Sequence, residues 1–218
     1  MLVGRDAGRV ERVAADLRVR SPAAEVDVVT ADFLDTTAIE SAVEGIATGG
    51  LIDIVLIAHG SLPDQKQCEE SLEAVKVALD INAVSPALYA EAFASHMARA
   101  GSGVIALVGS VAGDRGRKSN YVYGAAKGML DRYAQGLQHR FADSGVRVVL
   151  VKPGPTDTPM TAHLKGGGLK LASVESVARD IVTGIQKGKP VVYAPGKWQL
   201  IMLVIRCMPR VIFNKLNI

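Results

Sequence analysis

Short apolar runs alternate along this chain with longer segments of helical period. Leu51–Ala58, Gly103–Gly109 and Val146–Val151 are apolar over most of their length, which is typical of strands buried on both faces of a sheet. Between them lie segments with regularly spaced apolar residues, such as Thr36–Thr48 and Asn120–Asp143. This alternation predicts an α/β fold in which helices cover both faces of a parallel sheet.

Other segments have less regular patterns. We expect a short strand over Glu25–Thr30 and a long helix over Ser71–Ala100, kinked near Pro86. Lys152–Leu171 shows no clear period and is rich in Gly, Pro and Thr, so it is interpreted as a loop or lid.

Length, composition and cysteine spacing limit the class of protein further. The 218 residues show no repeat or linker and 49% of them are hydrophobic, so we expect one domain with a substantial core. The net charge of +3 comes from scattered residues, which argues against nucleic-acid binding. Cys68 and Cys207 lie far apart, so we expect no metal site and a reducing, cytoplasmic location. No apolar run reaches the ~20 residues that cross a bilayer.

The strongest chemical pattern begins where the run at Gly103–Gly109 ends. Ser110 follows it, Tyr123 comes thirteen residues later, and Lys127 lies one helical turn beyond Tyr123. Because ligands bind beyond the carboxyl ends of parallel strands, these side chains are expected at one site. The lysine charge would lower the tyrosine pKa from its usual value of about 10, so that the phenol could exchange a proton while the serine holds a carbonyl oxygen. A Tyr-x-x-x-Lys pair also arises by chance, and Ser110 at the strand end favours the catalytic interpretation.

These segments resemble the short-chain dehydrogenase/reductase family over nearly the whole chain. SVAGDRGRKSNYVYGAAKG matches the Ser…Tyr-x-x-x-Lys segment, LDINAVSPA the family asparagine, DIVLIAHG the Asn-Asn-Ala-Gly strand end and VKPGPTDTPM the Pro-Gly segment. The resemblance implies a Rossmann-like doubly wound parallel sheet and reduction of a ketone by NAD(P)H. The catalytic residues that it implies are Ser110, Tyr123, Lys127 and Asn82, the last of which positions a water in the family's proton relay.

The same resemblance implies contacts to the cofactor. Besides Tyr123 and Lys127, the implied residues are Arg5, Asp32, Phe33, Ala58, Gly60, Pro153, Gly154, Thr156 and Thr158. Arg5 favours the 2′-phosphate of NADPH, whereas the acidic Asp6 beside it is of the type that binds the free ribose of NADH. His59 stands where the family has an amide side chain and is interpreted as a packing or hydrogen-bonding residue.

The resemblance starts at the end of the family's second strand, at LVGRD. The expected fold therefore lacks the first strand, the Gly-rich turn and the first helix, because Gly4 and Gly8 do not replace that turn. Such a sheet would contain a gap with unpaired backbone groups along it. Three interpretations stay open: an active reductase, a non-catalytic binding or interaction subunit, and a translation start upstream of Met1.

A narrower resemblance is carried by AGDRGRKSNYVYGAAKGMLD, MTAHLKGGGL and the tail YAPGKWQLIMLVIRCMPRVIFNKLNI. These segments are similar to the decaprenylphosphoryl-2-keto-ribose reductase subfamily, the reductase subunit of an epimerase. The similarity implies a keto-sugar on a polyprenyl phosphate as substrate and a flavin oxidase as partner. The wider family implies a homodimer or homotetramer.

The tail also has a physical interpretation of its own. We divide the chain into an incomplete Rossmann domain, residues 1–196, and a basic amphipathic tail, residues 197–218. Apolar residues with an aromatic anchor, Trp198, and basic side chains predict contact with the inner face of a membrane. Packing on the substrate pocket or on a partner subunit is the alternative.

Overall fold

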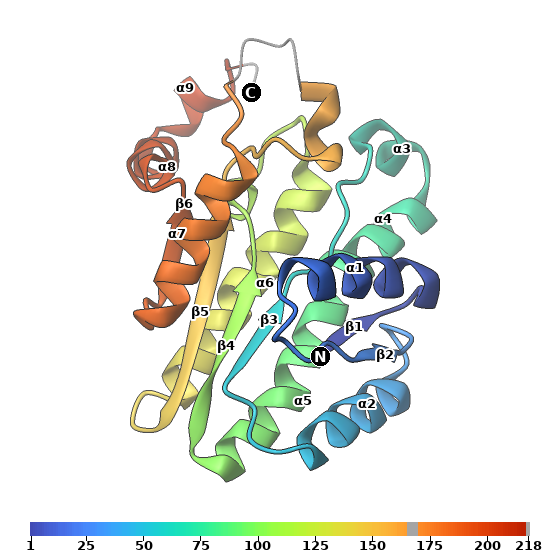
Figure 1. The fold of residues 1–218 in the computed structure, drawn as a ribbon. Helices are drawn as coiled ribbons and strands as arrows, with labels where there is room; N and C mark the ends of the chain where they lie inside the picture. The colour runs from blue at the N-terminus through green and yellow to red at the C-terminus, as the bar shows by residue number, and fades with distance from the viewer. Residues whose placement is uncertain (165–169, 217–218) are drawn as a thin grey trace.

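The structure is a computed structural model that describes residues 1–164 and 170–216, so residues 165–169 of the predicted loop and residues 217–218 of the tail lie outside it. Strands and helices alternate along it (Figure 1). The strands are β1 (Leu2–Gly4), β2 (Val28–Thr30), β3 (Ile54–Ile57), β4 (Ser102–Val108), β5 (Gly145–Pro153) and β6 (Val191–Ala194). The helices are α1 (Ala7–Arg20), α2 (Thr36–Thr48), α3 (Gln65–Glu70), α4 (Leu72–Leu79), α5 (Ser85–Ala100), α6 (Tyr121–Arg140), α7 (Val174–Gln186), α8 (Lys197–Cys207) and α9 (Arg210–Phe213). Shorter turns are η1 (Asp80–Val84), η2 (Val111–Asp114) and η3 (Pro159–Leu164).

The strands form two separate parallel sheets. β1 pairs with β2, and the larger sheet has the order β3-β4-β5-β6. In Figure 1 the β1–β2 pair lies on the β3 side of the larger sheet. No strand of the described chain joins the two, so the sheet is interrupted between β1 and β3. The predicted Rossmann-like α/β fold with a gap in its sheet is confirmed.

Helices cover both faces of the larger sheet. On one face Ile105, Leu107 and Leu150 are buried in a cluster that includes residues of α2, α5 and α6. On the other face Ala106 and Val149 are buried in a cluster with Ile185 of α7. The continuous apolar runs of β4 and β5 thus supply both cores, as strands buried on both faces must.

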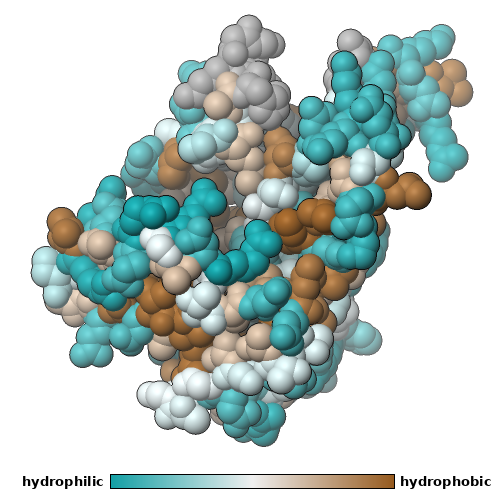
Figure 2. Space-filling view, turned by 90° about the vertical axis from the view of Figure 1, so that its right-hand side faces the viewer, coloured by the Kyte–Doolittle hydropathy of each residue, from teal (hydrophilic) through white to brown (hydrophobic). Residues whose placement is uncertain are grey.

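The edge strand β3 is buried on one face only, so the prediction that Leu51–Ala58 is buried on both faces is wrong. Val55 and Ile57 belong to the core with α5, whereas Ile54 and Leu56 are 52% and 51% exposed. These two share the face on which α7 packs, but α7 covers β5 and β6 at the far side of the sheet. Figure 2 views the molecule from the side of α1–α4 and shows apolar patches among hydrophilic residues on that surface.

The predicted helix Ser71–Ala100 is interrupted rather than kinked. α4 and α5 are joined by η1, a π-helical turn in which the Ser85 N–H donates to the Asp80 carbonyl. Pro86 explains the wide turn, because proline has no N–H and its ring excludes the carbonyl four residues earlier, that of Asn82. The predicted strand Glu25–Thr30 is likewise shorter, with only Val28–Thr30 paired to β1. None of the described helices is both long and apolar enough to span a bilayer.

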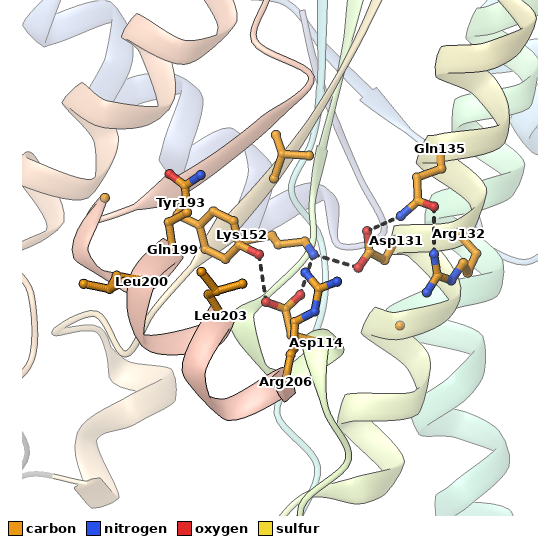
Figure 3. A pocket seen from close by; sticks show the side chains of 14 residues that line it. Asp114, Asp131, Arg132, Gln135, Lys152, Tyr193, Gln199, Leu200, Leu203 and Arg206 are labelled. Atoms are coloured by element: carbon orange, nitrogen blue, oxygen red, sulfur yellow. Dashed lines mark hydrogen bonds and ion pairs between the residues drawn. The ribbon is translucent and has the colours of Figure 1, made fainter. Parts of the chain in front are cut away.

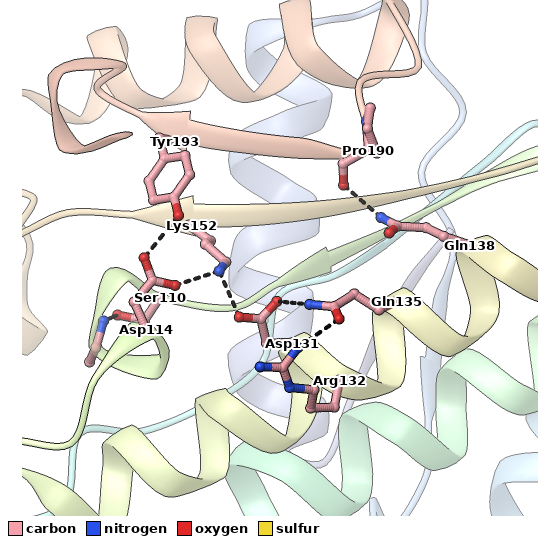
Figure 4. A network of polar contacts seen from close by, with 10 residues as sticks. Ser110, Asp114, Asp131, Arg132, Gln135, Gln138, Lys152, Pro190 and Tyr193 are labelled. Atoms are coloured by element: carbon pink, nitrogen blue, oxygen red, sulfur yellow. Dashed lines mark hydrogen bonds and ion pairs between the residues drawn. The ribbon is translucent and has the colours of Figure 1, made fainter. Parts of the chain in front are cut away.

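A buried ion network connects η2, α6, β5 and β6. Lys152 of β5 places Nζ 2.5 Å from Asp114 Oδ1 and 2.7 Å from Asp131 Oδ2. Tyr193 of β6 donates its hydroxyl to the second Asp114 oxygen at 2.8 Å. Figure 4 shows these side chains converging from the four elements. The assignment of Lys152 and Pro153 to a loop is therefore wrong, because β5 runs through both and pairs with β6.

The network is buried deeply enough to need all its members. The side chains of Lys152, Asp114 and Asp131 are 6%, 1% and 14% exposed. Burial disfavours the charge on Lys152, but the hydrogen bonds to both carboxylates outweigh burial and raise its pKa. Beside the network lies a cavity of about 740 Å³ between α6, β6 and α8 (Figure 3). Lys152, Asp114, Asp131 and Tyr193, which line this cavity, pair with one another, as a structural junction requires.

Replacing Lys152 by Met should lower the free energy of unfolding by about 3–5 kcal/mol, because two buried carboxylates lose their counter-charge. Urea unfolding measures this loss. The exposed Lys189→Met is the matched control and should change stability by less than about 0.5 kcal/mol. Adding Asp131→Asn to Lys152→Met should recover part of the stability, because one uncompensated charge is removed. Equal stability of Lys152→Met and the wild type would contradict this account of the network.

Candidate active site

A cavity of about 720 Å³ opens beyond the carboxyl ends of β3, β4 and β5. The loops after these strands form its walls, together with α6, α7 and the start of α8. Ligands of open α/β sheets bind in this position. The predicted site residues that line it are Ser110, Tyr123, Lys127, Asn82, Ala58, Gly60, Pro153, Gly154, Thr156 and Thr158.

Ser110, Tyr123 and Lys127 share one wall of this cavity. Ser110 precedes η2, where its hydroxyl accepts from the Ala112 N–H at 3.1 Å, and this hydroxyl is close enough to the Tyr123 phenol to favour the phenolate. Lys127 Nζ donates to the Val108 carbonyl at 3.0 Å and lies 5.8 Å from the Tyr123 ring centroid. The structure thus brings together the three residues whose spacing predicted a common site.

Close packing of η2 on α6 sets this arrangement. A Cβ on Gly113 would lie 2.8 Å from the Lys127 carbonyl carbon, so only glycine allows η2 to approach α6 this closely. Asp114 follows directly and enters the ion network with Asp131 of the same helix. The buried charges therefore keep the Ser110 loop against the helix that carries Tyr123.

The electrostatics of the pair differ from the expectation that Lys127 lowers the Tyr123 pKa. Burial raises the pKa of Tyr123, and the hydrogen bond from Ser110 offsets it only in part. Burial also lowers the pKa of Lys127 to about 8. The pKa of Lys127 falls because the residue is only 4% exposed and its ammonium faces a backbone carbonyl in place of a carboxylate.

Asn82 supports the loop that follows β3. It is fully buried in η1, where its Oδ1 accepts from the Ser61 N–H and its Nδ2 donates to the Ala78 carbonyl, both at 2.9 Å. A Cβ on Gly60 would lie 2.9 Å from Asn82 Oδ1 and 3.5 Å from Lys127 Nζ. The π-turn at Pro86 thus places the asparagine amide between the β3 loop and the lysine.

Arg5, Asp32 and Phe33, which are predicted for the adenosine side, lie outside the lining of the cavity, and Phe33 contacts His59, which lines it. Arg5 Cζ lies 5.6 Å from the Phe33 ring centroid, which is 4.4 Å from the His59 ring. Asp32 is exposed and accepts from the Leu34 N–H. His59 Nε2 lies 2.9 Å from Ser85 Oγ, and burial, with the charges of Lys127 and Arg5, lowers the His59 pKa to about 4. A neutral, packed His59 matches its interpretation from the sequence.

The C-terminal tail closes the other end of the cavity. A Cβ on Gly154 would lie 2.0 Å from the Trp198 indole nitrogen, so glycine permits α8 to pack on the Pro-Gly segment. Arg115 donates to the Ile205 and Met208 carbonyls at 2.5 and 2.6 Å and lies 3.7 Å from the Phe213 ring centroid. The tail is thereby tied to the loop that follows Ser110.

Sequence reasoning missed several residues of the site. Arg9, Arg117, Asn120 and Trp198 line the cavity, and Lys152 with its carboxylate partners holds the elements behind it. Arg117 and Asn120 lie inside the segment that carried the resemblance, between Ser110 and Tyr123, which was a usable signal. The pairing of Lys152 left no local signal, because its partners come from distant parts of the chain.

The arrangement fits a dinucleotide cofactor. The cavity has the volume of a ligand site at the carboxyl edge of the sheet, and Arg9 supplies positive charge from α1. Among residues 1–164 and 170–216 no group of three or more His, Cys, Asp or Glu side chains could hold a metal ion. Thr156 and Thr158 lie on the loop where the chain leaves β5, with Thr156 Oγ1 donating to the Gly154 carbonyl at 2.9 Å.

Lys127→Met should change how stability depends on pH. The unfolded chain holds the Lys127 proton up to the ordinary pKa of 10.5, but the folded chain only up to about 8. Between these values the unfolded state binds more protons, so the stability contributed by this group rises with pH. Relative to Lys127→Met, the wild type should therefore gain about 2 kcal/mol from about pH 7 to about pH 10 in urea unfolding. The exposed Lys118→Met should follow the wild type, and identical pH profiles for Lys127→Met and the wild type would refute the assignment.

Comparison with protein families and curated proteins identifies relatives of this chain. The family model described as short chain dehydrogenase matches residues 1–167. A Streptomyces coelicolor protein described as an uncharacterized oxidoreductase in the mprA 5′ region is 32% identical over 218 residues, which cover 99% of this chain and 84% of that protein. The uncharacterized oxidoreductase Rv2073c of Mycobacterium tuberculosis is 30% identical over 171 residues, or 78% of this chain and 68% of that protein.

Solved structures share the fold. One described as a short chain dehydrogenase/reductase family protein has a TM-score of 0.76 at 27% identity, over 90% of this chain and 85% of that one. A short-chain dehydrogenase from Sphingobium yanoikuyae in complex with NADPH has a TM-score of 0.75 at 23% identity, over 96% of this chain and 86% of that one. The sequence match over most of the chain, together with this fold, shows that the protein belongs to the short-chain dehydrogenase family of oxidoreductases.

Proposed function

We propose that this protein reduces a ketone to an alcohol with NAD(P)H, and that Ser110, Tyr123, Lys127 and Asn82 are its catalytic residues. The observation that carries the proposal is the shared cavity wall, where the Ser110 hydroxyl meets the Tyr123 phenol above a buried lysine. The cavity beside Lys152 has a phenol and an ammonium among its described lining residues but no Ser or Thr hydroxyl, whereas this cavity of ligand size has all three groups.

Each side chain has one task in this proposal. NAD(P)H, when bound, supplies the hydride that adds to the carbonyl carbon. Ser110 donates a hydrogen bond to the carbonyl oxygen, and Tyr123 gives that oxygen its phenolic proton. The Lys127 ammonium stabilises the phenolate left behind, since a positive charge favours the ionised phenol. Asn82 keeps the β3 loop beside Lys127, and solvent returns the proton to Tyr123.

The preferred cofactor in this proposal is NADPH. Arg5 lies at the end of β1, the position where a 2′-phosphate would meet a positive charge, and its guanidinium packs over Phe33. The related Sphingobium yanoikuyae enzyme was solved with NADPH, which supports the same choice. Pro153, Gly154, Thr156 and Thr158 would contact the nicotinamide half, with Ala58, Gly60, Asp32 and Phe33 toward the adenosine.

The alternative of a non-catalytic binding subunit is not favoured. It rested on the missing Gly-rich turn, whereas the cavity retains its hydroxyl, phenol and ammonium in one place. Cofactor titration followed by fluorescence separates the two, because a binding subunit without a cofactor site would show no saturation at millimolar NADPH.

Tyr123→Phe should abolish nearly all NADPH-dependent ketone reduction, since the phenolic proton has no substitute. The control is Tyr121→Phe, two residues earlier on the same helix, where the side chain is 47% exposed. It should keep activity within about twofold, in line with the small effects of surface changes. Steady-state kinetics decide, with thermal unfolding to confirm that both variants fold. Substantial turnover by Tyr123→Phe would rule out the proposed proton donor.

For the substrate and partners we propose the finer assignment that the tail favours: a keto-sugar on a polyprenyl phosphate, supplied by a flavin oxidase. In support, α8 presents Leu200, Leu203 and Val204 at 67%, 55% and 56% exposure, with Arg206 and Arg210 nearby. Exposed apolar residues beside basic ones suit the surface of an anionic membrane. The protein would thus work at the inner face of the membrane through residues 197–218, as a homodimer or homotetramer.

Leu200→Glu combined with Val204→Glu should reduce binding to vesicles of phosphatidylglycerol and phosphatidylcholine several-fold, because two charges enter the apolar face. Co-sedimentation of the full chain measures the effect. Leu72→Glu, at a residue of α4 that is 89% exposed, is the matched control and should pellet like the wild type. Equal pelleting of all three proteins would exclude membrane contact through α8.

A further inference from the structure

The charge inside the active-site cavity is one-sided. Arg9, Arg117 and Lys127 line it, and none of the described lining residues is an Asp or a Glu. Walls of one sign attract ligands of the opposite sign and raise their local concentration. The cavity is therefore suited to ligands that carry negative charge.

Arg117 is a cation of this cavity that has no ion-pair partner among the described residues. Its side chain is half-buried, and its buried Nε has no hydrogen-bond partner within residues 1–164 and 170–216. Burial lowers its pKa, and no charged group counteracts that effect. By contrast Arg115, two residues earlier, donates to carbonyl groups at the end of α8 and stacks on Phe213. A half-buried guanidinium without a partner lowers the stability of the folded protein, unless a bound ligand supplies the opposite charge.

We assign the charge of Arg117 to the substrate side of the cavity from its place in the chain. It lies on the loop between η2 and α6, so the chain leads from Ser110 through Arg117 to Tyr123. Arg9, the other free cation of the cavity, comes from α1, on the side of the adenosine cluster around Arg5 and Phe33. Lys127 is already hydrogen-bonded to the Val108 carbonyl.

Asn120 gives a second indication that this loop contacts a ligand. Its Oδ1 is buried without a partner, and it lines the cavity three residues after Arg117. Buried polar atoms in native proteins are almost always hydrogen-bonded, so these two groups on one short loop are available to a ligand of the cavity. An amide oxygen accepts from hydroxyl or amine groups, whereas a guanidinium binds carboxylate or phosphate.

We propose that Arg117 binds an anionic group of the ketone substrate, a carboxylate or a phosphate, and so makes the enzyme selective for acidic ketones. Asn120 accepts a hydrogen bond from a donor group of the same substrate. This inference rests on the proposed reductase function, because Ser110 and Tyr123 define where the carbonyl lies. It adds a specificity residue that takes no part in hydride or proton transfer.

Matched pairs of ketones test the proposal by steady-state kinetics with NADPH. One pair is 4-oxopentanoate and 4-oxopentanamide, and the other is dihydroxyacetone phosphate and dihydroxyacetone. The wild type should show a higher kcat/KM for the anionic member of at least one pair, by about tenfold to hundredfold. Arg117→Gln should remove that preference, and Arg117→Lys should restore part of it. The two pairs distinguish a carboxylate site from a phosphate site.

Control variants separate a substrate contact from other effects of charge. Lys118→Gln makes the same charge change at the next, exposed residue and should leave the preference intact. The KM for NADPH should stay the same in Arg117→Gln and rise in Arg9→Gln. A preference that survives Arg117→Gln, or an Arg117→Gln variant that weakens NADPH more than the anionic ketone, would overturn the proposal.

A binding experiment keeps the test independent of turnover. Trp198 is the only tryptophan of the chain and lines the cavity, so its fluorescence reports on ligands there. The affinities of 4-oxopentanoate and dihydroxyacetone phosphate are measured on the Tyr123→Phe variant loaded with NADPH. Each affinity is compared with that of the neutral ketone of the same pair. We expect the Tyr123→Phe variant to bind an anionic ketone more tightly than its neutral partner, and we expect this difference to disappear when Arg117→Gln is added to that variant. This result would support the anion site even if the reductase assignment fails. If the anionic and neutral ketones of both pairs bind with equal affinity, the proposed anion site is wrong even if ketone reduction is confirmed.

Discussion

Lys152 holds Asp114 and Asp131 together inside the protein, and the position of the candidate catalytic residues depends on this contact. Asp114 follows Ser110 by four residues, and Asp131 lies one helical turn beyond Lys127. The ion pairs therefore fix the distance between the loop and the helix that share the active site. Such a buried network is costly to assemble, because each charge leaves water, and costly to break, because any partner left alone is uncompensated. Its benefit here is geometric: the Ser110 loop and α6 cannot shift independently.

In the active-site cavity burial also opposes the charged form of a lysine, but there burial outweighs the favourable contacts. Lys152 keeps its proton because two carboxylates face it, whereas Lys127 has only a carbonyl partner and its pKa falls to about 8. Burial likewise raises the Tyr123 pKa, and the Ser110 hydroxyl opposes burial only in part. The charged forms of Lys127 and Tyr123 are therefore stabilised less by their surroundings than the charge of Lys152 is by its two carboxylates. Their proton affinities are consequently open to change by whatever charge a ligand brings, as proton transfer to a substrate requires.

The C-terminal tail belongs to the site as well as to the surface. Trp198 packs on Gly154, and Arg115 ties the end of α8 to the loop after Ser110. The outer side of α8 stays apolar and exposed. One segment thus forms a wall of the cavity and also exposes an apolar side to the outside of the protein. Sequence alone left these two interpretations of the tail as alternatives, and the structure is compatible with both.

Local patterns in the sequence determined the α/β fold, the positions of β4, β5, α2 and α6, and the common site of Ser110, Tyr123 and Lys127, because strand and helix periods and a one-turn spacing act over short distances. The interruption between β1 and β3 also followed from the order of segments. Only the tertiary structure decided that Ile54 and Leu56 are exposed, since that depends on how far α7 extends across the sheet. It alone paired Lys152 with Asp114 and Asp131 and left Arg117 unpaired, because the neighbours of a charge come from segments far apart in the chain. Burial, which no local pattern measures for a single ionisable group, then set the direction of every pKa in the site.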